Sequence, residues 1–394
     1  MSKLSVEQLD LQAKRVFLRA DLNVPLAGGD IADDSRLRAV LPTAEYCLKG
    51  GAGVVLASHL GRPRGKPDPS YSLAPVARRL EELLGRPVPL APDCAGETCE
   101  KLAQALRPGE CLLLENLRFD PGEEANDPAF AQALARLADC YVNDAFAASH
   151  RAHASIVAIT RYLKPAAAGL LMQRELAALE RVLDRPAHPL VAILGGAKVS
   201  DKLGLIRHLL ARADSVLIGG AMAFTFLRAL GHEVGRSLVE IELVKTALEV
   251  LAEARARGIR VGLPVDVVVA ADPESADGVR TVGIREVPRA LMALDIGPTT
   301  LARFKETLER AKTVVWNGPM GVFEKPAFAA GTLGLARAVA DSSAFSVVGG
   351  GETAAAVRQA GVGDKIGFLS TAGGAFLEFL EGRELPGVAV LTEA

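Results

Sequence analysis

Arginine side chains follow short apolar segments in the first half of the chain. Arg62, Arg118 and Arg151 each come shortly after such a segment, and Arg36 lies at the start of an expected helix. If the apolar segments are parallel strands of one sheet, their carboxyl ends share one edge. A planar guanidinium donates bidentately to carboxylate and phosphate oxygens. The spacing therefore predicts a site for a small anion, and the alternative is four separate surface ion pairs.

Other polar residues occupy the same kind of position. Asp21 and Asn23 follow the first apolar segment, where they are expected to accept hydrogen bonds from a substrate hydroxyl. His59 follows the second segment and is expected to donate to an anion. His150 and His153 have the H-x-x-H spacing, but no third ligand or carboxylate has metal-site spacing, so zinc is not expected.

Glycine-rich turns carry the corresponding chemistry in the second half. Lys198 and Lys202 lie in G-G-A-K-V-S-D-K (195–202), before an expected helix whose amino end favours phosphate and whose N-cap is expected to be Ser200. Glu324 is expected to accept hydrogen bonds from ribose hydroxyls, and Glu352 to bind Mg²⁺. We expect three turns to converge on one polyanion, the alternative being unrelated turns: W-N-G-P-M-G-V-F-E (316–324), V-G-G-G-E-T (348–353) and S-T-A-G-G-A (370–375).

Two common nucleotide-binding motifs are absent from the sequence. The chain contains neither the Walker A pattern G-x-x-x-x-G-K-[ST] nor the dinucleotide fingerprint G-x-G-x-x-G. The second absence argues against a nucleotide-binding oxidoreductase, which is the competing enzyme class for this architecture.

Strand-like and helical segments alternate almost throughout the chain. The expected strands are 16–20, 53–59, 111–116, 140–144, 190–196, 215–220, 265–270, 313–318 and 344–351. This order predicts an α/β protein with two Rossmann-like three-layer domains, each a mainly parallel sheet covered by helices. Residues 169–183 are expected to form a connecting helix, with a hinge near Pro186 and Pro189. The alternative is an ordinary surface helix within one domain.

Composition limits the remaining function classes. The 394 residues include 45 Lys and Arg against 47 Asp and Glu, a net charge of −2, which argues against binding to nucleic acid or to membrane surfaces. The five cysteines form no C-x-x-C pair, which is typical of reduced thiols in a cytosolic protein. The chain shows no signal-peptide core and no apolar run of the ~18 residues that a membrane span needs.

The motifs together resemble the phosphoglycerate kinase family. The match follows the family's order along essentially the whole chain: R-A-D-L-N-V-P (19–25), S-H-L-G-R-P (58–63), L-E-N-L-R-F (114–119), N-D-A-F (143–146), H-R-A-H (150–153), then G-G-A-K-V-S-D-K, W-N-G-P-M-G-V-F-E and G-G-G-E-T. The resemblance implies a cytosolic, usually monomeric enzyme of glycolysis and gluconeogenesis. It would transfer a phosphoryl group reversibly between 1,3-bisphosphoglycerate with ADP and 3-phosphoglycerate with ATP, with Mg²⁺.

The resemblance also implies a role for each motif residue and each part of the chain. Residues 1–170 would bind phosphoglycerate through Asp21, Asn23, Arg36, His59, Arg62, Arg118 and Arg151. Residues 171–185 would form the connecting helix and hinge, and residues 377–394 would return to the N-terminal domain. Residues 186–376 would bind the nucleotide and its metal through Lys198, Lys202, Asn317, Pro319, Glu324, Gly350, Gly351, Glu352 and Thr353, with Glu352 as the metal ligand.

Catalysis would then depend on positioning and charge neutralisation rather than on a covalent intermediate. Hinge closure would bring the two substrates together for in-line transfer. The transferring phosphoryl group would meet Arg36, Lys198, Lys202 and the amides of Gly351 and Gly374. The carboxylate of 3-phosphoglycerate is already an anionic nucleophile, so no general base is needed.

Three positions depart from the family pattern. Glu352 stands where the family usually has Asp, Ala372 replaces the first glycine of S-T-G-G-G-A, and Phe368 stands where many members have His. Glu352 has one methylene more than Asp, which is expected to change metal geometry or affinity. Glu352 and Ala372 leave one further alternative, a non-catalytic protein that binds the same ligands. Retention of Arg36, Lys198 and Lys202 argues against it.

Overall fold

The computed structural model describes residues 3–274, 277–370 and 372–394. It divides into two compact units. The first contains Met1–Ala177 together with Glu384–Ala394, and the second contains Ala178–Arg383. The units differ in the strand order of their sheets and in the chemistry at the carboxyl ends of the strands.

The first unit is built on a parallel sheet of five strands in the order β5-β4-β1-β6-β7. The strands are β1 (Arg15–Arg19), β4 (Gly53–Ala57), β5 (Cys111–Leu113), β6 (Cys140–Asn143) and β7 (Ala166–Ala168). Nearly every strand residue is buried, as expected for a parallel sheet covered on both faces. The order reverses between β1 and β6, and ligands of open α/β sheets bind at such a reversal.

Helices and one short hairpin complete this unit. The helices are α1 (Ser35–Lys49), α2 (Ala74–Leu84), α3 (Glu97–Gln104), α4 (Pro121–Glu124) and α5 (Pro128–Ala135), and the hairpin pairs β2 (Leu26–Ala27) with β3 (Asp30–Ile31). The apolar faces of α1 and α2 pack into the same hydrophobic core as β1 and β4. α2 ends at Gly85, whose φ of 63° suits a residue without a Cβ atom.

All five cysteines are free and buried in this unit. Burial raises the pKa of the Cys111 and Cys140 thiols to about 11. They therefore stay protonated at neutral pH and fill space in the core as small apolar side chains.

The second unit contains a larger parallel sheet and a smaller antiparallel one. The parallel sheet has the order β10-β9-β8-β14-β15-β16, with β8 (Leu190–Leu194), β9 (Ser215–Ile218), β10 (Arg260–Gly262), β14 (Thr313–Asn317), β15 (Phe345–Gly349) and β16 (Phe368–Ser370). Its order reverses between β8 and β14. The antiparallel sheet has the order β12-β11-β13, with β11 (Asp266–Ala270), β12 (Arg280–Gly283) and β13 (Met292–Ile296).

The helices of this unit follow its strands along the chain. They are α7 (Leu203–Leu210), α8 (Ala223–Ala229), α9 (Val244–Ala256), α10 (Pro298–Leu308), α11 (Ala330–Asp341), α12 (Gly351–Gln359) and α13 (Gly374–Leu380). A core around Trp316 joins α10, α11 and α12 to the parallel sheet. The expected α/β class with mainly parallel sheets is confirmed, and the antiparallel β11–β13 sheet is an addition that the alternating pattern did not predict.

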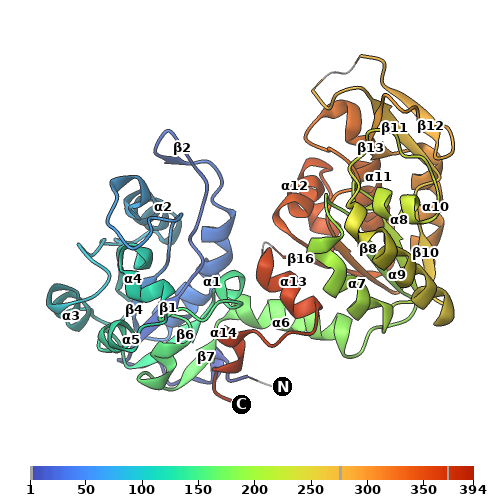
Figure 1. Ribbon diagram of the computed structural model, residues 1–394. Coiled ribbons are helices and arrows are strands. Elements are labelled where there is room, and N and C mark those ends of the chain that lie inside the picture. The colour runs from blue at the N-terminus through green and yellow to red at the C-terminus, as the bar shows by residue number, and fades with distance from the viewer. Residues whose placement is uncertain (1–2, 275–276, 371) are drawn as a thin grey trace. The chain divides into compact units, whose positions relative to one another are not determined.

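α6 (Leu170–Leu183) connects the two units along the chain, and the C-terminal segment completes the first unit. In that segment, α14 (Pro386–Ala389) is held by a hydrogen bond from Gly387 N to Ser149 O of 2.8 Å and by Asn143, whose Nδ2 donates to Gly387 O at 3.1 Å. The two ends of the chain lie side by side (Figure 1). The segment that belongs to the first unit begins at Glu384 rather than at 377, because α13 packs against α7 in the second unit.

No helix among the described residues is long and apolar enough to cross a membrane.

Candidate functional site

The sheet of the first unit brings the predicted anion-binding residues to one edge. Arg19, the last residue of β1, is in register with Ala57 at the end of β4 and with Asn143 at the end of β6. The predicted residues lie in the segments that follow these carboxyl ends: Asp21 and Asn23 after β1, His59 and Arg62 after β4, Arg118 in the 3₁₀ helix η3 (Leu117–Phe119) after β5, and Arg151 after η4 (Phe146–Ala148).

Hydrogen bonds fix the loops of this edge against one another. Nη1 of Arg36 lies 3.1 Å from Oδ2 of Asp21 and donates to Asn23 O at 2.9 Å. Asn23 Oδ1 accepts from Gly61 N at 2.9 Å, and Gly61 O accepts from Arg118 Nη1 at 2.8 Å. The exposed Arg62 follows this doubly anchored glycine. Segments after β1, β4 and β5 are thereby joined around one cluster of cations.

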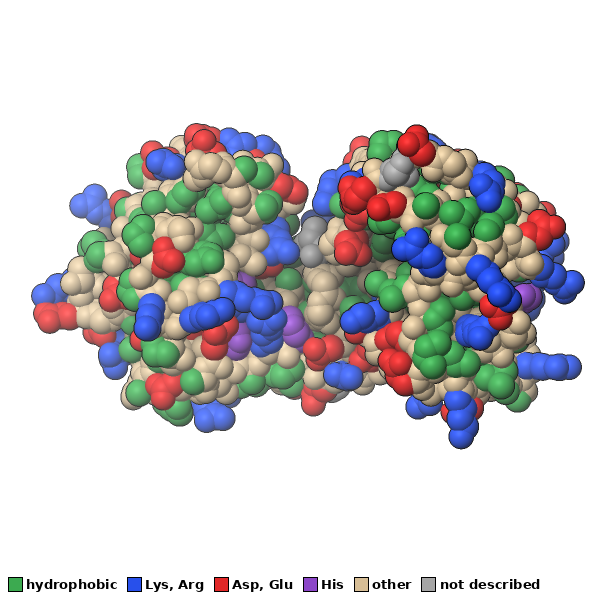
Figure 2. Space-filling view, turned by 45° about the horizontal axis from the view of Figure 1, so that its top comes forward, with side chains coloured by type: hydrophobic (Ala, Val, Ile, Leu, Met, Phe, Trp, Pro, Cys, Tyr) green, Lys and Arg blue, Asp and Glu red, His purple; other side chains and the backbone are tan. Residues whose placement is uncertain are grey.

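The surroundings of His59 and His153 favour the neutral form of each ring. Burial, together with the positive charge of Arg19 and Arg118, holds the pKa of His59 well below its usual range. The same causes lower the pKa of His153 to about 3. Arg151 Nε donates to His150 Nε2 at 3.2 Å. Figure 2 shows Lys and Arg side chains next to His side chains on one face of the first unit. Such a surface is chemically suited to an anion with several negatively charged oxygens.

Two buried charges that were not predicted, Arg19 and Glu123, lie beneath this cluster. Both side chains are essentially inaccessible to solvent, and they lie 3.9 Å apart. The signal for Arg19 was available, since a charged residue ends an otherwise apolar strand in R-V-F-L-R. Glu123 gave no comparable signal, because it lies among other acidic residues in an ordinary helical turn.

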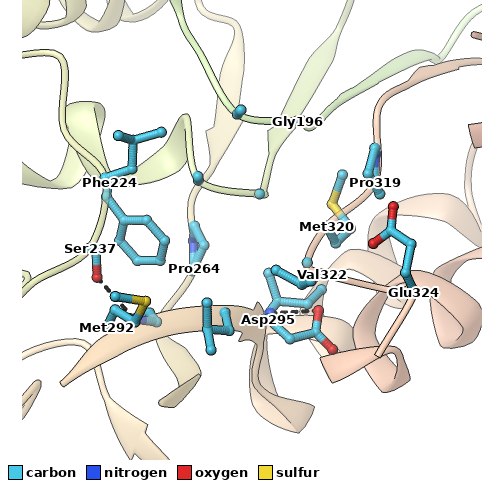
Figure 3. A pocket seen from close by; sticks show the side chains of 18 of the residues that line it. Gly196, Phe224, Ser237, Pro264, Met292, Asp295, Pro319, Met320, Val322 and Glu324 are labelled. Carbon is cyan, nitrogen blue, oxygen red and sulfur yellow. Dashed lines mark hydrogen bonds between the residues drawn. The ribbon is translucent and has the colours of Figure 1, made fainter. Parts of the chain in front are cut away.

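The second unit contains a pocket of about 440 Å³ at the reversal between β8 and β14. In Figure 3, Phe224, Pro264 and Met292 face Met320 and Val322 across the pocket. Phe224, Pro264 and Met292 were not predicted, because they are isolated apolar residues from separate elements, whereas Met320 and Val322 lie in the predicted turn at 316–324. An apolar slot with glycine turns at one end accepts a planar ring that carries a polar, extended substituent.

The turns after β8 and β14 approach each other so closely that side chains are excluded. Gly196 N donates to Pro319 O at 2.9 Å. A Cβ atom on Gly195 would lie 2.1 Å from Pro319 O. Gly318 has a φ of 97°, and a Cβ atom there would lie 2.2 Å from Gly195 O. The glycines at 195 and 318 are therefore required by contact between the two turns.

Lys202 lies beside these turns and is buried. Its Nζ donates to both the carbonyl and the side-chain oxygen of Asn317, and the first of these bonds measures 3.2 Å. Burial lowers the pKa of Lys202 to about 8, against the opposing charge of Glu352. Asn317 Nδ2 also donates to Gly349 O at 2.8 Å, which links the ends of β14 and β15. A desolvated ammonium group beside such glycine turns would interact strongly with a phosphate.

The remaining predicted residues lie in four places of the second unit. Pro319, Glu324 and Glu352 line the pocket. Thr353 Oγ1 accepts from Gly318 N at 2.7 Å, so the turn at 350–353 lies next to the turn after β14. Gly350, with a φ of 98°, is the N-cap of α12, and the exposed Gly351 is its first residue. Lys198 is exposed, and Gly374 is the first residue of α13, which packs against α7.

One local prediction is wrong. Ser200 does not cap a helix: it begins the 3₁₀ helix η6 (Ser200–Lys202), and its hydroxyl donates to Glu240 Oε1 at 2.5 Å. Glu240 also accepts from the backbone amides of Val199 and Ser200. A distant carboxylate therefore satisfies the amides that an N-cap would satisfy locally.

The departures from the family pattern are accommodated in different ways. Ala372 is buried, and its amide donates to Ser370 Oγ at 3.2 Å. Phe368 begins β16 and is in register with Val347. Thr371 of the S-T-A-G-G-A motif lies outside the described residues.

A basic cluster at one sheet edge and a glycine-lined pocket with a buried lysine at another are typical of enzymes that transfer phosphoryl groups to or from small anions. A statistical model of the phosphoglycerate kinase family matches residues 6–383. The chain therefore belongs to the phosphoglycerate kinase family.

Individual relatives are similar over nearly their whole length. The phosphoglycerate kinase of Moorella thermoacetica is 55% identical over 393 residues, covering 100% of both chains. That of Geotalea uraniireducens is 54% identical and covers 98% of this chain and 96% of its own. The solved structure of phosphoglycerate kinase from Coxiella burnetii superposes with a TM-score of 0.90 at 44% identity, covering 99% of this chain and 98% of its own.

The reaction follows from the family. The chain is a phosphotransferase with a carboxyl group as acceptor, and it transfers a phosphoryl group reversibly between 1,3-bisphosphoglycerate with ADP and 3-phosphoglycerate with ATP. Its substrates are thus a phosphoglycerate and a nucleotide.

Proposed function

We propose that the basic cluster of the first unit binds phosphoglycerate. The observation that carries this proposal is the convergence of segments after β1, β4, β5 and β6 on one set of donors. Arg62, Arg118 and Arg151 would bind the phosphate group through charge-assisted hydrogen bonds. Asp21 and Asn23 would accept from the substrate hydroxyl, and Arg36, held by both (Asp21 Oδ2 at 3.1 Å), would face the carboxyl end.

The pocket of the second unit would bind the nucleotide. The base would lie between the apolar walls at Phe224 and Met320, and Glu324 would accept from the ribose hydroxyls. The phosphates would lie along the glycine turns, where Lys198, Lys202 and the amides at 350–353 supply positive charge. Asn317, Pro319 and Thr353 hold these turns together through the hydrogen bonds described above.

Transfer requires the two substrates to meet, and the two binding sites lie in different units. We propose closure about the segment near 184–189, with in-line transfer in the closed state. Charge on the transferring phosphoryl group would then be balanced by Arg36 from one unit and Lys202 from the other, with Gly351 and Gly374 donating their amides. Closure would also exclude water, so that the acyl phosphate is not hydrolysed.

Mg²⁺ fits the residues at the start of α12. Glu352 is exposed in the first turn of that helix and lines the pocket. The described residues include no group of three acidic, histidine or cysteine side chains that would hold a metal ion alone. This agrees with Mg²⁺, which is commonly bound by one or two carboxylates together with substrate phosphates. When bound, Mg²⁺ would neutralise phosphate charge, and Glu352 would be its protein ligand.

A coupled assay of ATP-dependent phosphorylation of 3-phosphoglycerate, titrated with Mg²⁺, tests the proposal. We expect turnover that rises with Mg²⁺ to saturation. Absence of turnover, with both substrates still binding by calorimetry, would favour a non-catalytic binding protein instead. Retention of Arg36, Lys198 and Lys202 supports catalysis over binding alone.

Replacing Arg62 should weaken phosphoglycerate binding with little effect on chemistry. Arg62 is exposed beside the anchored Gly61, so Arg62→Ala removes a ground-state contact with the phosphate. We expect KM for 3-phosphoglycerate to rise about tenfold while kcat changes by less than about threefold. Arg78→Ala, which removes an exposed arginine on α2, is the matched control. An unchanged KM in Arg62→Ala would contradict the assigned role.

Shortening Glu352 should lower the Mg²⁺ requirement. The extra methylene of Glu places the carboxylate differently from the Asp that the family usually has. We therefore expect Glu352→Asp to reach half-maximal rate at a several-fold lower Mg²⁺ concentration, since Mg²⁺ demands near-ideal coordination geometry. Superimposable Mg²⁺ titrations of the two proteins would show that the methylene has no effect.

We further propose that the enzyme acts as a monomer in the cytoplasm, as the free cysteines and family membership suggest. Light scattering at enzyme concentrations that support turnover should give the mass of one chain, 41.3 kDa.

A further inference from the structure

The guanidinium of Arg19 is fully buried, and the contacts of each of its nitrogens are defined. Nε donates to Ser155 Oγ at 2.8 Å, and Nη1 donates to the carbonyl oxygen of Ala20. Nη2 lies 3.3 Å from Nδ1 of His59. A planar guanidinium held at all three nitrogens cannot rotate, so the direction of its bond to His59 is fixed.

Glu123 holds this arginine in place. Its side chain is also fully buried, with Oε1 3.9 Å from Arg19 Nη2. Ser155 bridges the pair, because its hydroxyl donates to Glu123 Oε1 at 2.6 Å and its backbone amide donates to Oε2 at 2.9 Å. Burial raises the pKa of Glu123, and the charge of Arg19 and the Ser155 bonds oppose that rise. A buried arginine needs such a partner, since an unpaired buried charge is strongly unfavourable.

The contact between Arg19 and His59 selects one tautomer of the histidine. Arginine has no acceptor and stays protonated in proteins, so it always donates. Nδ1 of His59 must then accept, which places the single ring proton on Nε2. A second proton on Nδ1 would point at the N–H group of Arg19 and break this hydrogen bond. The positive charges around the ring also disfavour a second proton, because they would repel a charged imidazolium. The titratable groups that face His59 are Arg19, Arg36, Arg118 and His153.

We propose that Arg19 and Glu123 are positioning residues that hold His59 as a neutral imidazole with its proton on Nε2, ready to donate to an oxygen of the phosphoglycerate. The substrate part of this inference rests on the proposed function of the basic cluster. The tautomer part is a property of the free protein. Neither positioning residue is needed to touch the substrate, because both lie beneath the site with no exposed surface.

Nitrogen-15 NMR of the imidazole rings of the free enzyme tests the tautomer. The chain has six histidines, and His59→Gln assigns the resonances of His59 by their loss. We expect His59 to show the pattern of a neutral ring protonated on Nε2, unchanged between pH 8 and pH 5. Titration of His59 within that range, or a proton on Nδ1, would overturn the proposal.

Glu123→Gln and Ser155→Ala test the positioning. In either variant we expect His59 to lose the fixed tautomer, and KM for 3-phosphoglycerate to rise about tenfold with KM for MgATP unchanged. Ser155→Ala is the second variant if Glu123→Gln does not fold. Tyr141→Phe is the structural control, because it removes a buried hydrogen bond to Ser155 O of 2.9 Å and leaves every hydrogen bond of Arg19 and Glu123 in place. It should leave both the tautomer and KM unchanged.

The outcomes separate this inference from the proposed function. An unchanged tautomer in both Glu123→Gln and Ser155→Ala would overturn the positioning role. If the tautomer changes but KM for 3-phosphoglycerate does not, Arg19 does position His59. That result would also show that His59 does not bind phosphoglycerate, contrary to the proposed function. An equal effect of Tyr141→Phe would show that general loosening, rather than the Glu123 network, sets the state of His59.

Discussion

Arg36→Ala should lower kcat about 10³-fold, a loss of roughly 4 kcal/mol at ~1.4 kcal/mol per tenfold change in rate. Arg36 lies in the first turn of α1, where Asp21 at 3.1 Å and Asn23 O at 2.9 Å orient its guanidinium. Its charge would meet the transferring phosphoryl group only in the closed, reacting state. The loss should therefore appear in kcat measured at saturating substrates.

Arg38→Ala is the matched control for this variant. Arg38 lies on the same helix, is exposed, and forms an ion pair with Asp34 one turn earlier at 2.8 Å. We expect its kcat to stay within twofold of the unchanged enzyme, since exposed pairs of this kind contribute little. A near-normal kcat in Arg36→Ala would contradict the assignment of Arg36 to the transition state.

Lys202→Met should lower kcat/KM for MgATP about 100-fold or more, because a desolvated ammonium beside the phosphates loses its charge. The unchanged enzyme should also lose activity with rising pH. Burial lowers the pKa of Lys202 to about 8, so the free enzyme carries less of the ammonium form as pH rises through that value. The alkaline limb of kcat/KM should then have a midpoint near pH 8.

The alkaline limb of kcat should lie at higher pH than the alkaline limb of kcat/KM. Bound phosphates favour the charged amine, so the midpoint in the complex should move to higher pH. Folding stability should change in the opposite sense to activity. Between about pH 8 and pH 10.5 the unfolded chain binds a proton at Lys202 that the folded chain does not, so the contribution of this lysine to stability rises with pH across that window.

In Lys202→Met, kcat/KM for MgATP should not change with pH around pH 8, because the titrating amine is absent. Lys305→Met, which removes an exposed lysine on α10, should keep the limb near pH 8 and near-normal kcat/KM. If Lys202→Met keeps the alkaline limb of kcat/KM near pH 8, that limb reports the titration of a group other than Lys202.

The sequence by itself predicted the α/β class and the candidate residues at strand ends. Both depend on local rules: buried parallel strands are short apolar runs, and sheet ligands bind beyond their carboxyl ends. Gly195 and Gly318 were found as parts of turns for the same reason. The failure at Ser200 shows the limit of such rules, since Glu240 reaches its amides from outside the local segment.

Only the tertiary structure decided which of these residues contact one another. The ion pair of Arg19 with Glu123, the apolar walls at Phe224 and Met320, and the burial of Lys202 all join elements that are distant in sequence. Strand order and side-chain packing place them together, and no periodicity or spacing encodes that order. The residue types were thus determined locally, while their charge states were set by the desolvation and neighbouring charges that only the folded chain provides.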